Sequence, residues 1–266
     1  MKRYALGIAG ILVIVFALTS ISWKSTGHSN AVNKLNSPAN PDLAYNTYLK
    51  DIYNTAQLEQ HGLSLDVFEK AVTGFFNLKL SGKISADKAI LSIADFDQSS
   101  KNKRLWIIDL AKRELILNTW VAHGQHSGGD RPTKFSNINN SFQSSMGFYV
   151  TGEIYNGQHG RSLRLDGMDE GFNSNARKRA IVVHGASYVS QGTINALGRL
   201  GRSQGCPAVP AELSNEVINT IGGKTVLFIN VSDVDYNSKY LNEGLAAQLA
   251  SNFYGMDNTL DTVSNI

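Results

Sequence analysis

Residues 104–122 read RLWIIDLAKRELILNTWVA, and this stretch decides the fold class of the 266-residue chain. The segments 104–110 and 114–122 are short, rich in β-branched and large apolar residues, and partly alternating, as strands are. The three residues AKR between them have the length of a hairpin turn. The stretch therefore predicts a β-hairpin in the middle of the chain.

Segments of similar character lie on both sides of this hairpin. Further strands are expected at 89–96, 147–153, 180–184 and 225–231. Apolar residues at helical spacing predict a helix from about Tyr45 to Gly62 and a second one capped by Ser64. Short helices are expected at 211–221 and after Leu241. The chain is thus predicted to be mainly β with appended helices, an α+β fold.

Composition bounds the class of protein. Apolar residues make up 42% of the chain and charged residues 18%, which suits one domain of about 200 residues with appendages. The formal charge is +3, and it falls by two if the N-terminal segment with Lys2 and Arg3 is removed. A nearly neutral chain without long basic runs gives no electrostatic case for nucleic-acid binding.

The N-terminus has the pattern of an export signal. Lys2 and Arg3 precede an apolar run at 5–18, and small residues come after it. An uncleaved membrane anchor across residues 4–23 is the alternative. Either way the lysine and arginine favour export of the remainder of the chain.

Cys206 is the single cysteine, in the stretch SQGCP. Structural cysteines of exported proteins usually come in pairs, so a lone one is a buried filler, an intermolecular linker or a reactive thiol. Gly205 permits unusual backbone angles, and the N–H groups of Gly205 and Cys206 are candidate donors to an oxyanion. Arg202 and Arg199 precede the cysteine and could lower the thiol pKa or bind a substrate carboxylate.

A reactive thiol needs a base, and His184 is the candidate. It ends the apolar segment AIVVHGASY and is followed by a glycine. His123 and His126 have a spacing that a metal site can use, but there is no nearby acidic ligand and no HExxH pattern, so zinc is disfavoured. The other interpretation of these two histidines, and of His159 in the stretch GQHGRS, is a loop histidine near the site that contacts substrate.

Taken together, these stretches give the chain a resemblance to the catalytic domain of L,D-transpeptidases, the YkuD-like group. The resemblance rests on VVHGASY (182–188) followed by GRLGRSQGCPAV (198–209), and it covers roughly residues 88–232. Within this family, the chain is similar to the branch whose cysteine motif reads GRSxGCPAV. Gln204 stands where the commoner signature has histidine, and no arginine follows Cys206.

The resemblance implies a β-sandwich-like domain without metal or organic cofactor. Cys206 would attack a tetrapeptide stem of peptidoglycan, release D-alanine, and pass the acyl group to an amine to form a 3–3 cross-link. His184 would be the base, oriented by a backbone carbonyl as is common in the family, and Ser203 and Gly205 would complete the motif. Contacts with substrate are expected from Arg199, Arg202, Gln204, Tyr188 and His123.

The sequence leaves alternatives open. Water instead of an amine would make the chain an L,D-carboxypeptidase, and a non-catalytic peptidoglycan-binding envelope protein is the alternative from another class. The expected location is the periplasm or cell envelope of a bacterium, and the oligomeric state is not predicted. The expected organisation is a signal peptide or anchor at 1–22, a polar linker at 23–42, a helical segment at 43–87, a catalytic domain at 88–232 and a helical tail at 233–266.

Overall fold

The structure is a computed structural model that describes residues 41–232 and 235–248, all within one compact unit. The expected signal or anchor, and most of the linker, lie outside these residues. Within the described part, no helix combines the length and apolar character that crossing a membrane requires. The C-terminal helix expected after Leu241 begins at residue 243 and continues to 248, where the described residues end.

Eight strands form one mixed sheet, in the order β3-β2-β1-β8-β4-β5-β6-β7. The strands are β1 (Ile90–Asp95), β2 (Leu105–Asp109), β3 (Glu114–Thr119), β4 (Gly147–Gly157), β5 (Gly160–Gly167), β6 (Val182–Ala186), β7 (Ala208–Pro210) and β8 (Val226–Asn230). The helices are α2 (Pro41–Thr55), α3 (Leu65–Leu80), α4 (Gln191–Leu197) and α5 (Ser214–Ile221), with the 3₁₀ turns η1 (Ala211–Leu213) and η2 (Lys239–Leu241). The predicted α+β class is confirmed.

The hairpin of residues 104–122 is confirmed, since β2 and β3 pair antiparallel around a turn that contains AKR. The sequence pattern did not predict three of the elements, namely β5, β7 and α4. Strand β5 carries charged residues on its outer face, α4 buries none of its residues, and β7 is three residues long, so each lacks a strong periodic signal. The first helix ends at Thr55, before Gly62, because Gln57 adopts a positive φ of 52°.

The two ends of the sheet approach each other, so that it nearly closes into a barrel. Beyond β3, Ala122 bridges to Ala208 in β7, and Gly124 bridges to Ser203. Strand twist accumulated over eight strands brings the first and last strands together in this way. As a result, the segment 122–128 lies beside the loop that carries Cys206.

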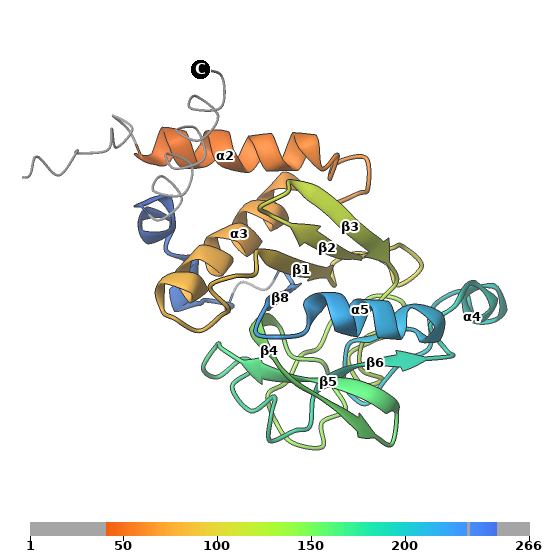
Figure 1. The fold of residues 1–266 in the computed structure, drawn as a ribbon. Helices are drawn as coiled ribbons and strands as arrows, with labels where there is room; N and C mark the ends of the chain where they lie inside the picture. The colour runs from red at the N-terminus through yellow and green to blue at the C-terminus, as the bar shows by residue number, and fades with distance from the viewer. Residues whose placement is uncertain (1–40, 233–234, 249–266) are drawn as a thin grey trace, which may run out of the picture. The chain divides into compact units, whose positions relative to one another are not determined.

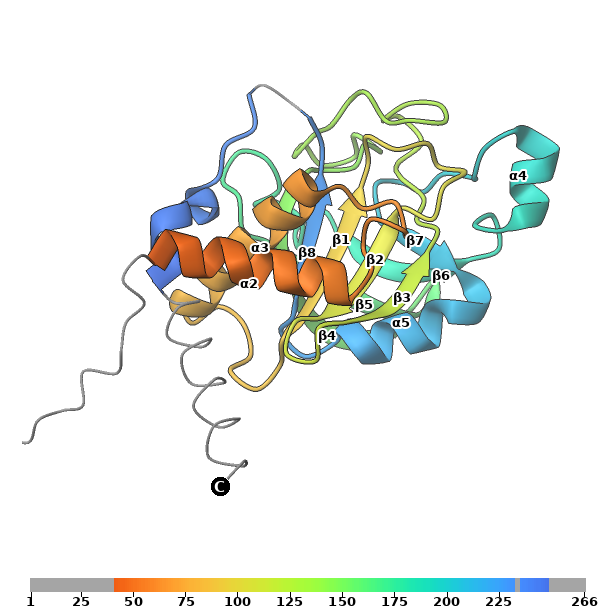
Figure 2. The same cartoon turned by 90° about the horizontal axis from the view of Figure 1, so that it is seen from above.

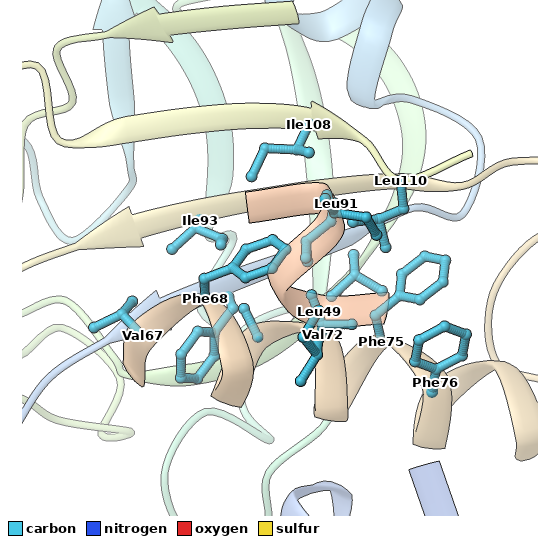
Figure 3. Packing of buried hydrophobic residues seen from close by; sticks show 14 of the residues in the cluster. Leu49, Val67, Phe68, Val72, Phe75, Phe76, Leu91, Ile93, Ile108 and Leu110 are labelled. Carbon is cyan, nitrogen blue, oxygen red and sulfur yellow. The ribbon is translucent and has the colours of Figure 1, made fainter. Parts of the chain in front are cut away.

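The central strands β2, β1 and β8 are buried on both faces, which explains their nearly continuous apolar sequences, and the first five residues of β4 are buried beside them. Successive residues point to opposite faces, so that in β8 Phe228 joins one core and Leu227 the other. The first core lies under α2 and α3, where Phe68, Val72 and Phe75 of α3 meet Leu91 and neighbouring sheet residues (Figure 3).

Helices α2 and α3 cover one face of the sheet, and α5 packs on the other side (Figures 1 and 2). Helix α3 approaches closely at Gly74, where an added Cβ would lie 2.0 Å from the Phe148 ring. Helix α4 projects away from the body of the domain (Figure 2). The helical segment therefore completes the core of the sheet, while the other end of the sheet remains available for a site.

Candidate active site

Cys206 and His184 are brought together by two neighbouring strands. His184 lies on β6, and its register partner on the parallel strand β7 is Ala208, two residues after Cys206. The backbone N–H of Val182, also on β6, donates to the Cys206 Sγ at 3.4 Å. Both side chains line a pocket of about 580 Å³. The two residues selected from the sequence therefore belong to one site.

The turn that carries the thiol is fixed by Ser203. Its Oγ donates to the Cys206 carbonyl at 2.6 Å and accepts from the Gly205 N–H at 3.0 Å, and its side chain is buried. Ser203 also donates its backbone N–H to the His123 carbonyl at 2.9 Å. Ser203 is thus a positioning residue for the thiol, acting on the backbone on both sides of it.

Gly205 is required by geometry. Its φ is +120°, and an added Cβ would lie 2.7 Å from the Gln143 carbonyl oxygen. The expectation that its N–H donates to an oxyanion is corrected, because that N–H already donates to Ser203 Oγ. Among the described residues no acceptor is found for the Cys206 N–H, which leaves it as the candidate oxyanion donor of this turn.

The thiol is half-buried, and burial raises the pKa of Cys206 above its ordinary value. The Val182 N–H and the Arg179 guanidinium act in the opposite direction and lower this pKa. The thiol itself donates weakly to the Ala180 carbonyl at 3.8 Å. Because a thiol with a raised pKa is protonated at neutral pH, its reaction requires a base.

Arg179 is the functional residue that the sequence prediction missed. It lines the pocket and donates to the carbonyls of Ser136 and Gln143, at 2.5 and 2.6 Å, so it also holds the 136–145 loop against the site. Burial lowers the pKa of its guanidinium, and the Cys206 thiolate raises it. Arg179 stands five residues before His184, inside the stretch RAIVVHGASY, but its adjacency to the thiol depends on the pairing of β6 with β7.

His184 is 2% exposed, and burial lowers the pKa of its imidazole. Its Nδ1 lies 3.0 Å from the Gly185 carbonyl oxygen, so in the neutral ring this nitrogen carries the hydrogen and Nε2 is the free acceptor. The backbone carbonyl expected to orient the histidine is therefore confirmed as Gly185. A neutral imidazole with a free Nε2 is the form that can accept a thiol proton.

The arginines selected from the sequence have other partners. Arg202 lines the pocket, but its Nη1 donates to the carbonyls of Gly128 at 2.6 Å and Gln125 at 3.2 Å, so it braces the neighbouring loop. Arg199 donates to the carbonyl of Leu200 and is not among the described residues that line this pocket. The cation that acts on the thiol is Arg179, which corrects the expectation that Arg202 or Arg199 activates it.

His123 is corrected as a substrate contact, because its side chain is 1% exposed and accepts a hydrogen bond at Nδ1 from Arg104 Nη2 at 2.8 Å. Burial and the neighbouring Arg104 lower the pKa of His123 to about 3. Its contribution to the site is the backbone carbonyl that accepts from Ser203. A guanidinium on Nδ1 is incompatible with zinc there, and the described residues contain no cluster of three histidine, cysteine or carboxylate ligands.

Tyr188 and Gln204 both line the pocket, as expected for substrate contacts. Tyr188 packs over Gly201, and burial together with the nearby Cys206 thiolate raises the pKa of its phenol to about 12. The Gln204 side chain is exposed. The pocket thus combines a thiol, a neutral imidazole, a guanidinium and a backbone N–H, the set that cysteine acyl transfer uses.

Comparison with protein families is consistent with this geometry. The family described as the L,D-transpeptidase catalytic domain matches residues 59–230, well over half of the chain. The chain belongs to this family. No curated protein matches its sequence. The L,D-transpeptidase match begins at residue 59 and so includes helix α3, which supplies part of the core of the sheet.

The solved structures that this chain resembles are distant in sequence. An L,D-transpeptidase from Mycobacterium smegmatis is 11% identical over 54% of this chain and 59% of its own, with a TM-score of 0.33. The helical cell shape determining protein Pgp2 from Campylobacter jejuni is 15% identical over 68% of this chain and 63% of its own, with a TM-score of 0.37. The chain thus spans about three fifths of the length of these two proteins.

Proposed function

We propose that this chain is a peptidoglycan L,D-transpeptidase that uses Cys206 as its nucleophile. The observation that carries the proposal is the joint placement of Cys206 and a neutral, carbonyl-oriented His184 in one pocket of the L,D-transpeptidase domain. The substrate would be a tetrapeptide stem of peptidoglycan, as the family implies. The compartment would be the periplasm or cell envelope, which the N-terminal pattern of the sequence supports.

In the first half-reaction, His184 Nε2 accepts the Cys206 proton, and Sγ forms a bond to the carbonyl carbon of the third stem residue. The oxyanion that develops on the carbonyl oxygen would accept a hydrogen bond from the backbone N–H of Cys206. The C–N bond to D-alanine then breaks, and the imidazolium returns its proton to the leaving amine. The products are a thioester on Cys206 and free D-alanine.

In the second half-reaction, an amine of a neighbouring stem attacks the thioester. His184 accepts the amine proton, and the C–S bond breaks. The positive charge of Arg179, which lowers the pKa of Cys206, stabilises the thiolate that leaves. The lowered pKa of His184 keeps its ring neutral at pH 7, so the base is available without prior deprotonation. Activity is therefore expected to fall only on the acid side of the ordinary histidine pKa of 6.5.

The test compares the wild-type protein with Cys206→Ala and Cys206→Ser on purified disaccharide tetrapeptides, with products resolved by mass. We expect a cross-linked dimer that lacks one D-alanine from the wild type and none from either variant. Arg199→Ala is the matched control, since Arg199 lies in the same loop with its side chain outside the pocket, and it should retain wild-type turnover.

The same mass analysis separates the acceptors. A tripeptide product without dimer would identify water as the acceptor and make the chain a carboxypeptidase. Continued acyl transfer by Cys206→Ala would exclude the cysteine mechanism. Binding to sacculi without any turnover, and without a carbapenem adduct on Cys206, would identify a non-catalytic binding protein.

A further inference from the structure

The β4–β5 hairpin extends beyond the core towards the active site. Its tip pairs Gly157 with Gly160, which leaves Gln158 and His159 as the two turn residues. The first five residues of β4 are buried, whereas most of those from Glu153 onward are exposed. A register shift inside the hairpin marks a bulge, and bulges bend a strand and redirect the residues beyond them. Figure 1 shows the long curved pair of strands.

His159 lies on the ring of His184. Strand β5 is the neighbour of β6, with Ser162 opposite His184, and His159 stands three residues before Ser162. The two imidazole rings are stacked, with centroids 4.2 Å apart and planes 17° from parallel. His159 is exposed, while His184 is almost fully buried. One face of the candidate base is therefore covered by a side chain from the tip of an exposed hairpin.

The stack supplies a constraint that the hydrogen bond of His184 does not. The bond from Nδ1 to the Gly185 carbonyl fixes one edge of the ring, but one hydrogen bond leaves the ring free to tilt about it. A second ring at stacking distance fixes the plane. It also keeps water from that face, and burial is the main cause of the lowered His184 pKa, with the charge of His159 acting in the same direction.

We propose that His159 is a positioning residue for His184, holding the imidazole plane and excluding water from it, so that the hairpin tip must be seated for the base to act. This inference rests on the proposed function, since it gives His184 the role of base. Its loop GQHGRS marked His159 as a histidine that could lie near the site, but the sequence did not indicate a contact with His184, 25 residues away.

The hairpin is held at its base and beside its tip, where Arg161 donates to Asn219 Oδ1 of α5 at 2.6 Å and to the Asn215 carbonyl at 3.3 Å. Arg177 donates to both Glu153 and Asp166 across the two strands, which holds the base of the hairpin together. The remaining titratable groups around the stacked histidines line the same pocket: Tyr155 on β4, Arg179 before β6, Tyr188 after it, and Arg202 and Cys206 before β7. Arg179 and Arg202 donate to the backbone carbonyls of neighbouring loops. His159 is the group that stacks on the His184 ring.

The experiment uses His159→Ala, which removes the stack, and His159→Phe, which retains a neutral ring. Asn156→Ala is the control, because Asn156 is exposed in the same hairpin and lies outside the pocket lining. We expect kcat on disaccharide tetrapeptides to fall roughly tenfold or more in His159→Ala, with KM within about twofold, since misplacing a reacting group by about 1 Å can cost 10²-fold. His159→Phe should restore most of kcat, and Asn156→Ala should match the wild type.

A second readout is independent of turnover. The pKa of His184, followed by NMR of labelled imidazoles in the Cys206→Ala protein, should rise in His159→Ala and stay closer to the wild-type value in His159→Phe. Wild-type kcat in His159→Ala would overturn the proposal, as would an unchanged His184 titration. If wild-type protein shows no acyl transfer, the proposed function fails. The titration and the rate of Cys206 alkylation by iodoacetamide then decide the role of His159.

Discussion

Replacing Gly205 with alanine should damage the site through two separate effects. The glycine has a φ of +120°, where an L side chain is strained, at a cost of about 1–3 kcal/mol. The new Cβ would also lie 2.7 Å from the Gln143 carbonyl oxygen, which cannot move freely because Arg179 Nη2 holds it at 2.6 Å. Overpacking of this kind costs about 1–3 kcal/mol. Together the expected loss is about 2–6 kcal/mol, a large share of the roughly 5–15 kcal/mol that stabilises a domain.

If the turn relaxes instead of the whole fold, the thiol moves. A displacement of about 1 Å would lower the rate of Cys206 acylation by up to about 10²-fold. Urea unfolding measures the first effect, and the rate of carbapenem adduct formation by mass measures the second.

Gly198→Ala is the matched control for Gly205→Ala. Gly198 has a φ of +67° in the same segment, but nothing lies within 4 Å of its added Cβ, so only the backbone cost of about 1–2 kcal/mol applies. Gly205→Ala should therefore be the less stable variant, or the slower one in acylation. The reasoning is refuted if the two variants unfold at the same urea concentration and both acylate at the wild-type rate.

Three further predictions concern neighbouring groups. Ser203→Ala should lose about 2–4 kcal/mol in urea unfolding, because the Gly205 N–H and the Cys206 carbonyl lose their buried partner; a loss below about 0.5 kcal/mol would contradict this. Arg179→Met should slow alkylation of Cys206 at neutral pH, since the thiol pKa rises further without the guanidinium, and Arg179→Lys should slow it less. An unchanged alkylation rate in both variants would show that Arg179 does not lower the thiol pKa. Stability should fall as pH drops from 6.5 towards 3, because folded His123 stays neutral with a pKa of about 3 while the unfolded ring binds a proton. His123→Gln should show a smaller slope over this range, and an identical slope would show that His123 is not responsible.

The sequence by itself determined the elements whose signal is local. The hairpin at 104–122 and the central strands follow from apolar residues that satisfy two buried faces, and these strands were predicted from the pattern alone. The pair of Cys206 and His184 followed from a lone cysteine, an upstream histidine and the resemblance to L,D-transpeptidases. Gly205 and Ser203 were selected as parts of the motif, although their contacts were not.

Tertiary structure decided which groups surround the thiol. Arg202 is four residues from Cys206 in sequence, yet its guanidinium braces a loop, whereas Arg179, 27 residues away, acts on the thiol. His123 was expected at the substrate and is buried against Arg104, because the sheet curls until Ala122 meets Ala208. His159 reaches His184 through a bulged hairpin. Spacing along a chain determines which face of a strand a side chain occupies, but register, twist and bulges determine which strand lies beside it, and these emerge only when the whole sheet closes.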